Sequence, residues 1–398
     1  MIDLGSPDTY TNGIPHDVFR ELRRTAPVSW NPEPNGPGFW AVTRHADILT
    51  VLKNPSTFSS HRGSALLEDP PPEFLAKLRE NMLNRDPPDH TKLRKLTNHV
   101  FSPKRITLLE QRIAAYATQL VDQIVERDAC DFAVDVAGKM PLFVICEILG
   151  VPVDDRARLY ALTGRMFGST IADRAEAMKD GMLAAGEMRA YAAELAARRT
   201  SEPSEDLASD LLAAEIDGRK LTAGEFQAFF MLLFNAGADT TRSLLCYGLD
   251  LLVRHPASLA RVQSDLSLLP ASIEEMLRYE PAVIQFRRTA TMDTELAGTN
   301  IESGAKVVVF FPSANRDEDV FPDPDRFDIQ RTPNHHLAFG HGTHFCLGAP
   351  LARMESLAVF REVLARIERI EPSAPLATSR TNFIRSVHHQ PITFRCRA

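Results

Sequence analysis

The sequence predicts a mainly α-helical fold with a small β portion that distant segments contribute. Alanine-rich stretches of helical character fill the middle of the chain, as at 175–199, and a longer apolar run follows at 221–256. Signals for strands are few. They are "FWAVT" at 39–43 and "KVVVFF" at 306–311, each rich in β-branched or aromatic residues and bounded by Gly or Pro. We therefore expect helices to dominate the core.

The composition narrows the class of protein. The chain has 398 residues, which is long for one domain; length alone allows two or three, although single domains of this size exist. Hydrophobic residues make up 44% and charged residues 24%, as in ordinary globular proteins. The net charge is −7 and no cluster of Lys and Arg occurs, so the composition argues against a nucleic-acid-binding protein.

The sequence carries no targeting signal that we recognise. Its N-terminal segment has no basic start followed by an apolar run, and no stretch reaches the apolar length of a membrane span. We therefore expect a cytoplasmic protein without a membrane anchor. The five cysteines are widely scattered and form no CxxC pair, so neither a disulfide framework nor a cysteine-based zinc site is indicated.

The longest predicted helix spans 221–256. Thr222 and Glu225 have the spacing of a capping box at its start, and Pro256 ends it. A continuous helix of about 34 residues is roughly 50 Å long at ~1.5 Å per residue. Because the run is apolar nearly all round, we expect it to be buried through the middle of the molecule.

The centre of this helix departs from the apolar pattern. Gly237, Asp239 and Thr240 place poor helix formers and an acid inside it, next to Asn235 and Thr241. These residues favour a local opening of the helical hydrogen-bond ladder, and such openings occur at functional sites. A packing notch for a crossing helix is the alternative interpretation.

A second helix is predicted at 272–281, where Ser272 and Glu275 form a capping box and Pro281 marks the end. Glu275 and Arg278 lie three residues apart, so their side chains can pair. Such pairs are common on solvated helix faces, and this one alone indicates no function.

The segment "NHHLAFGHGTHFCLGAP" at 334–350 gathers residue types that bind metals well. They are His335, His336, His341, His344 and Cys346. Zinc is one candidate, but the spacing fits no familiar zinc finger or catalytic zinc pattern. Gly340, Gly342 and Gly348 indicate a tight irregular loop rather than a rigid set of converging imidazoles.

An amphipathic helix is predicted at 351–370, so Cys346 lies at or just before a helix N-terminus. Backbone N–H groups and the helix dipole there lower the pKa of a thiol and stabilise the thiolate. A loop pared down to glycine lets a flat, bulky group approach the backbone closely. These features together are typical of a cysteine that ligates haem iron.

The loop "FGHGTHFCLG" at 339–348 resembles the haem-binding loop of the cytochrome P450 family, with Cys346 as the axial thiolate. Three further matches occur in the family's order. "AGADTT" (236–241) is similar to the oxygen-activating kink of the long central helix, "EEMLR" (274–278) contains the Glu-x-x-Arg pair, and 313–331 resembles the meander region. Segments 86–96 and 286–298 are similar to those of soluble bacterial members. The resemblance covers nearly the whole chain, without a departure at a motif position.

This resemblance implies one cytochrome P450 domain over 1–398, a triangular helical prism with the haem between the long central helix and the helix after Cys346. The β-rich part is expected from about 25–60, from 285–330 and from the C-terminal segment. The implied activity is that of a monooxygenase with haem b as cofactor and O2 as co-substrate. Electrons would come from NAD(P)H through a ferredoxin reductase and an iron–sulfur ferredoxin.

The resemblance also implies roles for individual residues. Asp239 and Thr240 would deliver protons at the distal face of the haem; the alternative is that Thr240 bonds its own helix carbonyl and Asp239 forms a salt bridge. Glu275 and Arg278 would fasten their helix to the meander as a buried pair.

The residues expected to hold the cofactor are His90, Arg94, Ala236, Arg288, Phe339, His344, Cys346 and Gly348, with Cys346 on the iron. Among these, His90, Arg94, Arg288 and His344 would meet the haem propionates. The remaining histidines, His335, His336 and His341, would have no ligand role.

A hydrophobic substrate is expected, because the residues that would face it are mostly apolar. They are Leu232, Asn235, Val283 and Ile284, under a roof formed by 61–85 and 160–185. Asn235 would supply one polar anchor. The substrate would be a steroid, a terpenoid or a branched lipid, with tailoring of a macrolide or peptide natural product as the alternative.

We expect a monomer that docks its ferredoxin near Cys346. Lys92, Lys95, Lys104 and Arg353 are the candidate basic contacts, although each could also belong to a solvated charged face. Two functions of other classes stay open at this point: a haem-binding sensor without turnover, and a zinc hydrolase that uses the histidine cluster.

Overall fold

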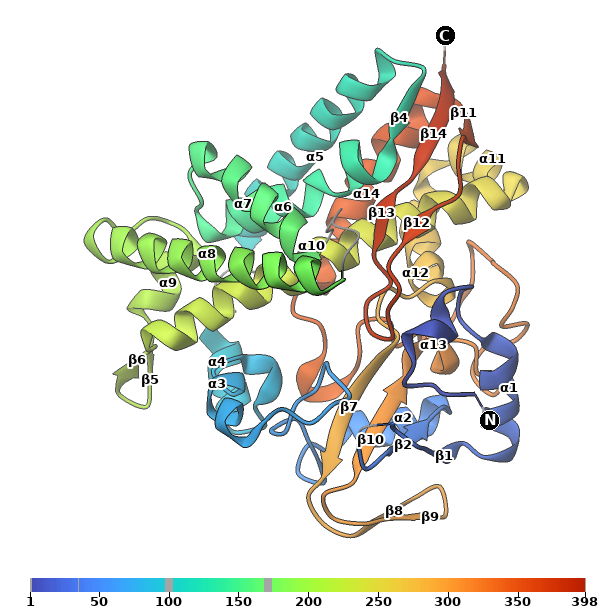
Figure 1. Ribbon diagram of the computed structural model, residues 1–398. Coiled ribbons are helices and arrows are strands. Elements are labelled where there is room, and N and C mark those ends of the chain that lie inside the picture. The colour runs from blue at the N-terminus through green and yellow to red at the C-terminus, as the bar shows by residue number, and fades with distance from the viewer. Residues whose placement is uncertain (1, 35, 97–102, 168–173, 398) are drawn as a thin grey trace.

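The computed structural model describes residues 2–34, 36–96, 103–167 and 174–397, and it is mainly helical. Figure 1 shows the long helix α10 (Ala223–Arg254) crossing the middle of the molecule, with helices α5 to α9 on one side and the main sheet on the other. The described helices are α1 (His16–Thr25), α2 (His45–Lys53), α3 (Leu75–Leu78), α4 (Asp89–Leu96), α5 (Pro103–Val125), α6 (Lys139–Leu149), α7 (Val153–Phe167), α8 (Arg174–Ser201), α9 (Leu207–Ala213), α10, α11 (Pro256–Ser264), α12 (Leu269–Tyr279), α13 (Phe311–Ala314) and α14 (Ala349–Arg366).

The strands form one sheet of five and several smaller ones. The five-stranded sheet has the order β1 (Val28–Asn31), β2 (Phe39–Val42), β10 (Lys306–Phe310), β7 (Gln285–Ala290) and β3 (Phe58–Ser59). The smaller sheets contain β4 (Ala129–Asp131), β5 (Glu215–Ile216), β6 (Arg219–Lys220), β8 (Thr294–Leu296), β9 (Thr299–Ile301), β11 (Ile367–Pro372), β12 (Ala377–Thr378), β13 (Val387–His389) and β14 (Pro391–Cys396).

The two strands predicted from the sequence are neighbours in the main sheet. β2 and β10 run parallel, with Val308 opposite Ala41, and both residues are fully buried. Such parallel central strands are apolar on both faces, which is why they read as continuous hydrophobic runs. The expectation that the β-rich part comes from segments far apart in the sequence is confirmed.

The start of α10 has the predicted capping box. The Thr222 hydroxyl accepts from the Glu225 N–H at 3.2 Å, and the Glu225 carboxylate accepts from the Thr222 N–H at 2.9 Å. The helix ends at Arg254, and Pro256 begins α11 instead of continuing it.

The predicted opening in the centre of α10 is wrong. The helix is α-helical throughout, and Gly237 lies against Ile145 of α6, where an added Cβ would be 3.0 Å from the Ile145 Cδ1 atom. The alternative interpretation, a packing notch for a crossing helix, therefore holds for this glycine.

Two helix boundaries also differ from the prediction. α12 begins at Leu269, so Ser272 lies inside the helix and its hydroxyl donates to the Leu268 carbonyl at 2.8 Å. Pro270 favours this earlier start, since proline fits the first helical turn. α14 ends at Arg366, not at residue 370, because Ile367 starts β11 and pairs with β14.

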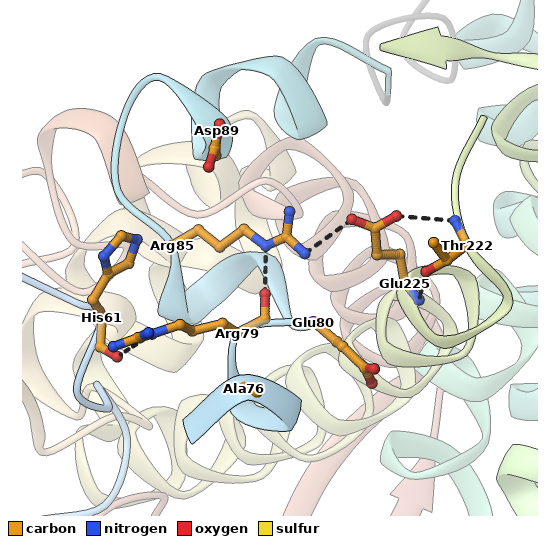
Figure 2. A pocket seen from close by; sticks show the side chains of 8 residues that line it. All are labelled: His61, Ala76, Arg79, Glu80, Arg85, Asp89, Thr222 and Glu225. Carbon is orange, nitrogen blue, oxygen red and sulfur yellow. Dashed lines mark hydrogen bonds and ion pairs between the residues drawn. The ribbon is translucent and has the colours of Figure 1, made fainter. Parts of the chain in front are cut away.

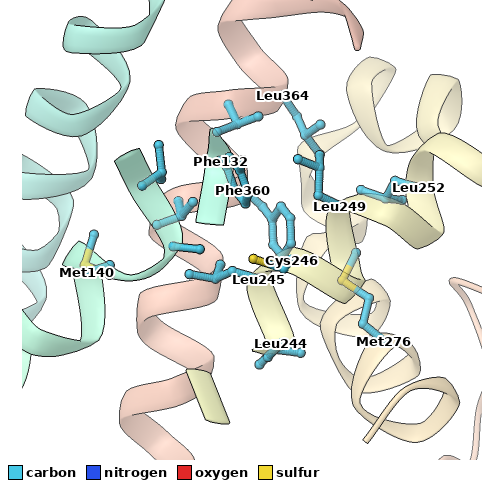
Figure 3. Close-up of a cluster of buried hydrophobic side chains, with 14 of the residues drawn as sticks. Phe132, Met140, Leu244, Leu245, Cys246, Leu249, Leu252, Met276, Phe360 and Leu364 are labelled. Atoms are coloured by element: carbon cyan, nitrogen blue, oxygen red, sulfur yellow. The ribbon is translucent and has the colours of Figure 1, made fainter. Parts of the chain in front are cut away.

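The largest part of the core joins α10, α12 and α14. Figure 3 shows Cys246 and Leu249 of α10 beside Phe360 of α14 and Met276 of α12. The helices approach closely at Gly248, where an added Cβ would lie 2.7 Å from the Met276 sulfur. This packing holds α14, and with it the loop that carries Cys346, against the central helix.

Within the described residues, no helix has the length and apolar character needed to cross a membrane.

Candidate active site

A cavity of about 1090 Å³ lies between α10, the loop before α14, β7 and the segment 63–84. Its lining is mostly apolar, as the sequence predicts. It includes these residues predicted from the sequence: His90, Arg94, Leu232, Asn235, Ala236, Asp239, Thr240, Val283, Arg288, Phe339, His344, Cys346 and Gly348. The structure therefore brings together residues that are up to 258 positions apart in the chain, from His90 to Gly348.

Ile284 is the exception and corrects the prediction. It is fully buried in a core cluster with Phe19, Phe39 and Phe310, and it does not line the described cavity. Neighbouring residues of an extended segment point to opposite sides, so Val283 faces the cavity and Ile284 faces the core.

Glycine sets the course of the loop that carries Cys346. Gly340 and Gly342 have positive φ angles of 67° and 68°, and an added Cβ on Gly342 would lie 2.5 Å from the Leu52 carbonyl oxygen. The Cys346 N–H donates to the Phe339 carbonyl at 2.9 Å and closes the loop. The sulfur is thereby placed in the wall of the cavity.

Burial raises the pKa of the Cys346 thiol, against the expectation that the helix N-terminus lowers it. The N–H groups of Gly348 and Ala349 and the charges of Arg94 and Arg353 act in the lowering direction but do not outweigh burial. α14 begins three residues after the cysteine, so few amides reach the sulfur. A bound metal cation would supply the missing stabilisation of the thiolate.

Basic side chains line another part of the cavity. Burial lowers the pKa of Arg288 to about 10; its guanidinium donates to the Arg287 carbonyl, and no carboxylate of the described residues lies within ion-pair distance of it. The His90 and His344 rings are 4.1 Å apart between centroids, and the buried His90 Nδ1 has no partner among the described residues. Arg94 donates to the Thr343 carbonyl at 3.3 Å.

This arrangement fits a haem. The two propionates of haem need cationic or hydrogen-bonding partners, and Arg288 and His90 have capacity for such a partner. A Cβ added at Gly348 would meet no protein atom within 4 Å, so the cavity is open beside the cysteine loop. The cavity thus combines a cysteine, an open space beside it and basic groups. A flat anionic cofactor with a metal would bind to such a combination.

The histidines do not form a zinc site. Across the described ranges, no three His, Cys, Asp or Glu side chains come close enough to hold a metal ion. His336 instead pairs with Glu274 at 3.1 Å, the His335 carbonyl accepts from the His45 ring at 2.9 Å, and His344 contacts the Ser60 hydroxyl at 3.3 Å. The zinc hydrolase hypothesis is therefore not supported.

Asp239 and Thr240 both line the cavity and make local contacts. The Thr240 hydroxyl donates to the Ala236 carbonyl at 2.6 Å, and Asp239 pairs with Arg242 at 2.6 Å. These are the two contacts named above as the alternative to proton delivery. A third contact was not foreseen: the Ser386 hydroxyl donates to the Asp239 carboxylate at 2.7 Å.

Glu275 and Arg278 form a fully buried ion pair at 2.7 Å. Arg278 also donates to the carbonyls of Asn315, Pro324 and Arg326, and Glu275 accepts from the Asp328 N–H at 2.9 Å. The pair thus ties α12 to the irregular segment that leads into the cysteine loop.

Sequence reasoning missed Glu355, an acid of α14 that lines the cavity. Burial raises the pKa of its carboxyl to about 8, and its Oε2 atom has no partner in the described part of the chain. The signal in the sequence is an acid among the apolar residues of the helix that follows Cys346.

The predicted roof agrees in part with the lining. Many residues of 63–84 line the cavity, whereas the described part of 160–185 contributes Met166; residues 168–173 lie outside the described residues.

A second, smaller cavity of about 270 Å³ lies beside this roof (Figure 2). There Arg85 pairs with Glu225 at 3.0 Å and links the roof to the start of α10.

Two of the four basic residues proposed for partner docking are already engaged. Lys92 pairs with Asp217, and Arg353 pairs with Glu274 at 2.6 Å and lies over the Phe339 ring at 4.6 Å. Lys95 is exposed, and the side chain of Lys104 lies outside the described residues.

Comparisons with known proteins give one answer. The family model for cytochrome P450 matches residues 6–375. The steroid C26-monooxygenase of Rhodococcus jostii is 35% identical over 99% of this chain and 84% of its own length, and the linalool 8-monooxygenase of Pseudomonas putida is 36% identical over 96% of each chain. The crystal structure of substrate-free CYP109E1 from Bacillus megaterium has a TM-score of 0.89, with 32% identity over 96% of this chain and 99% of that one.

The sequence motifs, the fold and these relatives therefore agree. Haem b bound through a cysteine thiolate and O2 as co-substrate follow from this membership, as do electron supply through redox partners and a hydrophobic substrate. The chain belongs to the cytochrome P450 family, and it is a haem-thiolate monooxygenase.

Proposed function

We propose that this enzyme hydroxylates a steroid, a terpenoid or a branched lipid, with Cys346 as the iron ligand and Asp239 and Thr240 as the proton-delivery groups. One observation carries the proposal: a single large, mostly apolar cavity contains the sulfur, the acid, the hydroxyl and the basic cluster together. Thiolate-ligated haem supplies activation of O2 for insertion of one oxygen atom into a C–H bond.

The chain's own residues hold the cofactor. Cys346 binds the iron, and the N–H groups of Gly348 and Ala349 hydrogen-bond the sulfur. Phe339, covered by the Arg353 guanidinium, shields the thiolate from water. Ala236 of α10 lines the same cavity and would contact the cofactor there.

Arg94, Arg288, His90 and His344 bind the propionates. Buried Arg288 supports this role, because no carboxylate of the described part of the chain pairs with it and a buried cation without an anion destabilises the fold. His90 supports it through its unpartnered Nδ1 atom.

Asp239 and Thr240 move protons from solvent to the distal side of the cavity. A carboxylate and a hydroxyl one residue apart can pass a proton, since the hydroxyl both donates and accepts. For this role Thr240 turns away from the Ala236 carbonyl, and Asp239 exchanges one of its present contacts for Thr240 or water.

The substrate lies against Leu232 and Val283, with Asn235 as its polar anchor. The Asn235 Oδ1 atom is buried without a partner among the described residues, so a hydroxyl group of a bound molecule would satisfy it. The names of two relatives, a steroid C26-monooxygenase and a linalool 8-monooxygenase, support a largely apolar substrate.

Electrons come from a ferredoxin and its reductase, which meet a monomeric enzyme in the cytoplasm. The docking face is the side of the Cys346 loop, where Lys95 is exposed. Docking there shortens the path from the iron–sulfur cluster to the haem.

The test has two steps. A CO-difference spectrum of the reduced protein should show thiolate-ligated haem, and its absence would overturn the proposal. Testosterone, linalool, a methyl-branched fatty acid and a macrolide are then titrated while the spin state is recorded. A shift to high spin with one of the first three, followed by hydroxylated product, supports the substrate class; a shift with the macrolide alone contradicts it.

A further inference from the structure

Strands β12 and β13 and the segment between them, residues 377–389, form the C-terminal hairpin. A serine of this hairpin contacts the acid of the central helix. The Ser386 hydroxyl donates to the Asp239 Oδ2 atom at 2.7 Å, across 147 residues of sequence. Both residues are 4% exposed. Hydrogen bonds to a charged group in such surroundings are strong and well oriented.

The contacts of Asp239 divide between its own helix and the hairpin. Its Oδ1 atom pairs with Arg242 at 2.6 Å, three residues further along α10. A partner on the same helix moves with Asp239 and leaves its direction relative to the cavity weakly determined. Ser386 comes from another element, so it fixes the carboxylate relative to the rest of the molecule.

The hairpin that carries Ser386 also forms part of the cavity wall. The Ser379 N–H donates to the Ser386 carbonyl at 2.9 Å, and the Ile284 N–H donates to the Phe383 carbonyl at 2.8 Å. The cavity-lining residues of this segment are Ser379, Arg380, Thr381, Phe383, Ile384 and Ser386. A molecule bound in the cavity therefore touches the segment that positions the acid.

We propose that Ser386 is a positioning residue for Asp239, and that through it the C-terminal hairpin couples substrate fit to proton delivery. The inference rests on the proposed role of Asp239. With the hydroxyl in place, the carboxylate keeps one orientation toward the distal side of the cavity. Without it, Arg242 is the one remaining side chain of the described residues that orients the carboxylate, so proton delivery slows and more of the reduced oxygen is released as hydrogen peroxide.

Ser386→Ala tests this in the holoenzyme, reconstituted with ferredoxin, reductase and NAD(P)H. The substrate is whichever of testosterone and linalool gives the larger spin shift. We expect product formed per NAD(P)H to fall by about threefold or more and peroxide to rise, while the spectral Kd stays within about twofold. Ser386→Thr, which keeps the hydroxyl, should restore coupling. Thr378→Val removes a hydroxyl from the exposed strand β12 of the same hairpin and serves as the control.

The same variant in an Asp239→Asn background separates positioning from a general structural effect. If Ser386 acts through Asp239, Ser386→Ala changes neither the coupling nor the solvent isotope effect of Asp239→Asn. An undiminished effect in that background, or normal coupling in Ser386→Ala alone beside an impaired Asp239→Asn, overturns the inference and leaves the role of Asp239 intact. Normal coupling in Asp239→Asn overturns the proposed role of the acid as well.

Discussion

The half-buried thiol of Cys346 and the buried guanidinium of Arg288 both favour a partner from outside the chain. Burial raises the pKa of the thiol and lowers that of the guanidinium, because burial disfavours the charged form of each group. A metal cation beside the sulfur and a carboxylate beside the guanidinium reverse both effects. The physical chemistry of these two residues thus agrees with a cofactor that carries both groups.

Replacement of the iron ligand gives the clearest test at this scale. Cys346→Ala should abolish activity, and the thiolate-type ferrous–CO absorption should disappear, because no other cysteine lines the described cavity. Cys396→Ala, at a half-buried thiol of β14, is the control and should behave as wild type. An unchanged ferrous–CO spectrum in Cys346→Ala would refute the assignment.

The elements around the site are held by a few buried charged contacts. α12 is tied to the segment before the cysteine loop through Arg278, and the start of α10 is tied to the roof through Glu225. In both cases one side chain serves several partners at once. Removing it leaves buried polar groups without partners, which is more harmful than the loss of a single exposed pair.

Arg278→Ala should lower the free energy of unfolding by about 3–5 kcal/mol, because it removes the nearer partner of the fully buried Glu275 carboxylate and the donor to three backbone carbonyls. Among the described residues, Arg331 at 3.2 Å then remains as the ion-pair partner of Glu275. We also expect haem incorporation to fall, measured as the ratio of haem absorbance to protein absorbance. Arg369→Ala removes an exposed pair with Glu371 and should change stability by less than about 1 kcal/mol. Equal effects of the two variants would contradict this account.

The Glu225 carboxyl gives α10 a pH-dependent contribution. Hydrogen bonds from Arg219 are the largest cause that lowers the pKa of Glu225 to about 2, from its usual value near 4.5. A lowered folded-state pKa means that the stabilisation is complete above about pH 4.5 and is lost as the pH falls toward 2. Glu225→Gln should therefore lower the free energy of unfolding by about 1–3 kcal/mol at pH 7.

The difference between wild type and Glu225→Gln should shrink between pH 5 and pH 3, measured by denaturant unfolding at each pH. Glu371→Gln, at an exposed site, should show no comparable trend. A difference that stays constant over this range would show that the carboxylate charge contributes nothing to the capping box.

Over the whole molecule, the cavity is lined by residues of helices, strands and loops. Its lining includes residues of α4, α10, β7, α14 and the C-terminal hairpin, so a bound cofactor would join segments that are far apart in the chain. Stability and cofactor binding are thus coupled by mass action.

Removal of the haem should lower the midpoint of thermal unfolding and increase hydrogen exchange in the segments 63–84 and 338–348. The buried Arg288 then has no carboxylate of the described residues within ion-pair distance, and the segments on either side of the cavity lose their common contact. Differential scanning calorimetry of the holo and apo forms measures the first effect. Equal midpoints would mean that the protein alone holds the cavity open.

The sequence by itself determined the family, the iron ligand candidate, the capping box of the central helix and the two central strands. These features depend on local chemistry, such as glycines at positive φ, a capping spacing and apolar runs. Nearly all of the cofactor-binding, proton-delivery and substrate-binding residues that it predicted line the cavity, because the motif resemblance carried that information.

Only the tertiary structure decided which interpretation of Gly237 holds, on which side Ile284 lies, and what Asp239 contacts. The reason is that each depends on packing between segments far apart in the chain. The interpretation of Gly237 depends on its contact with Ile145 of α6. The orientation of the Asp239 carboxylate depends on its hydrogen bond with Ser386, 147 residues away. No local sequence pattern indicates a role for Ser386, since a serine before a short strand is common. Its proposed role follows from its contact with Asp239 of α10.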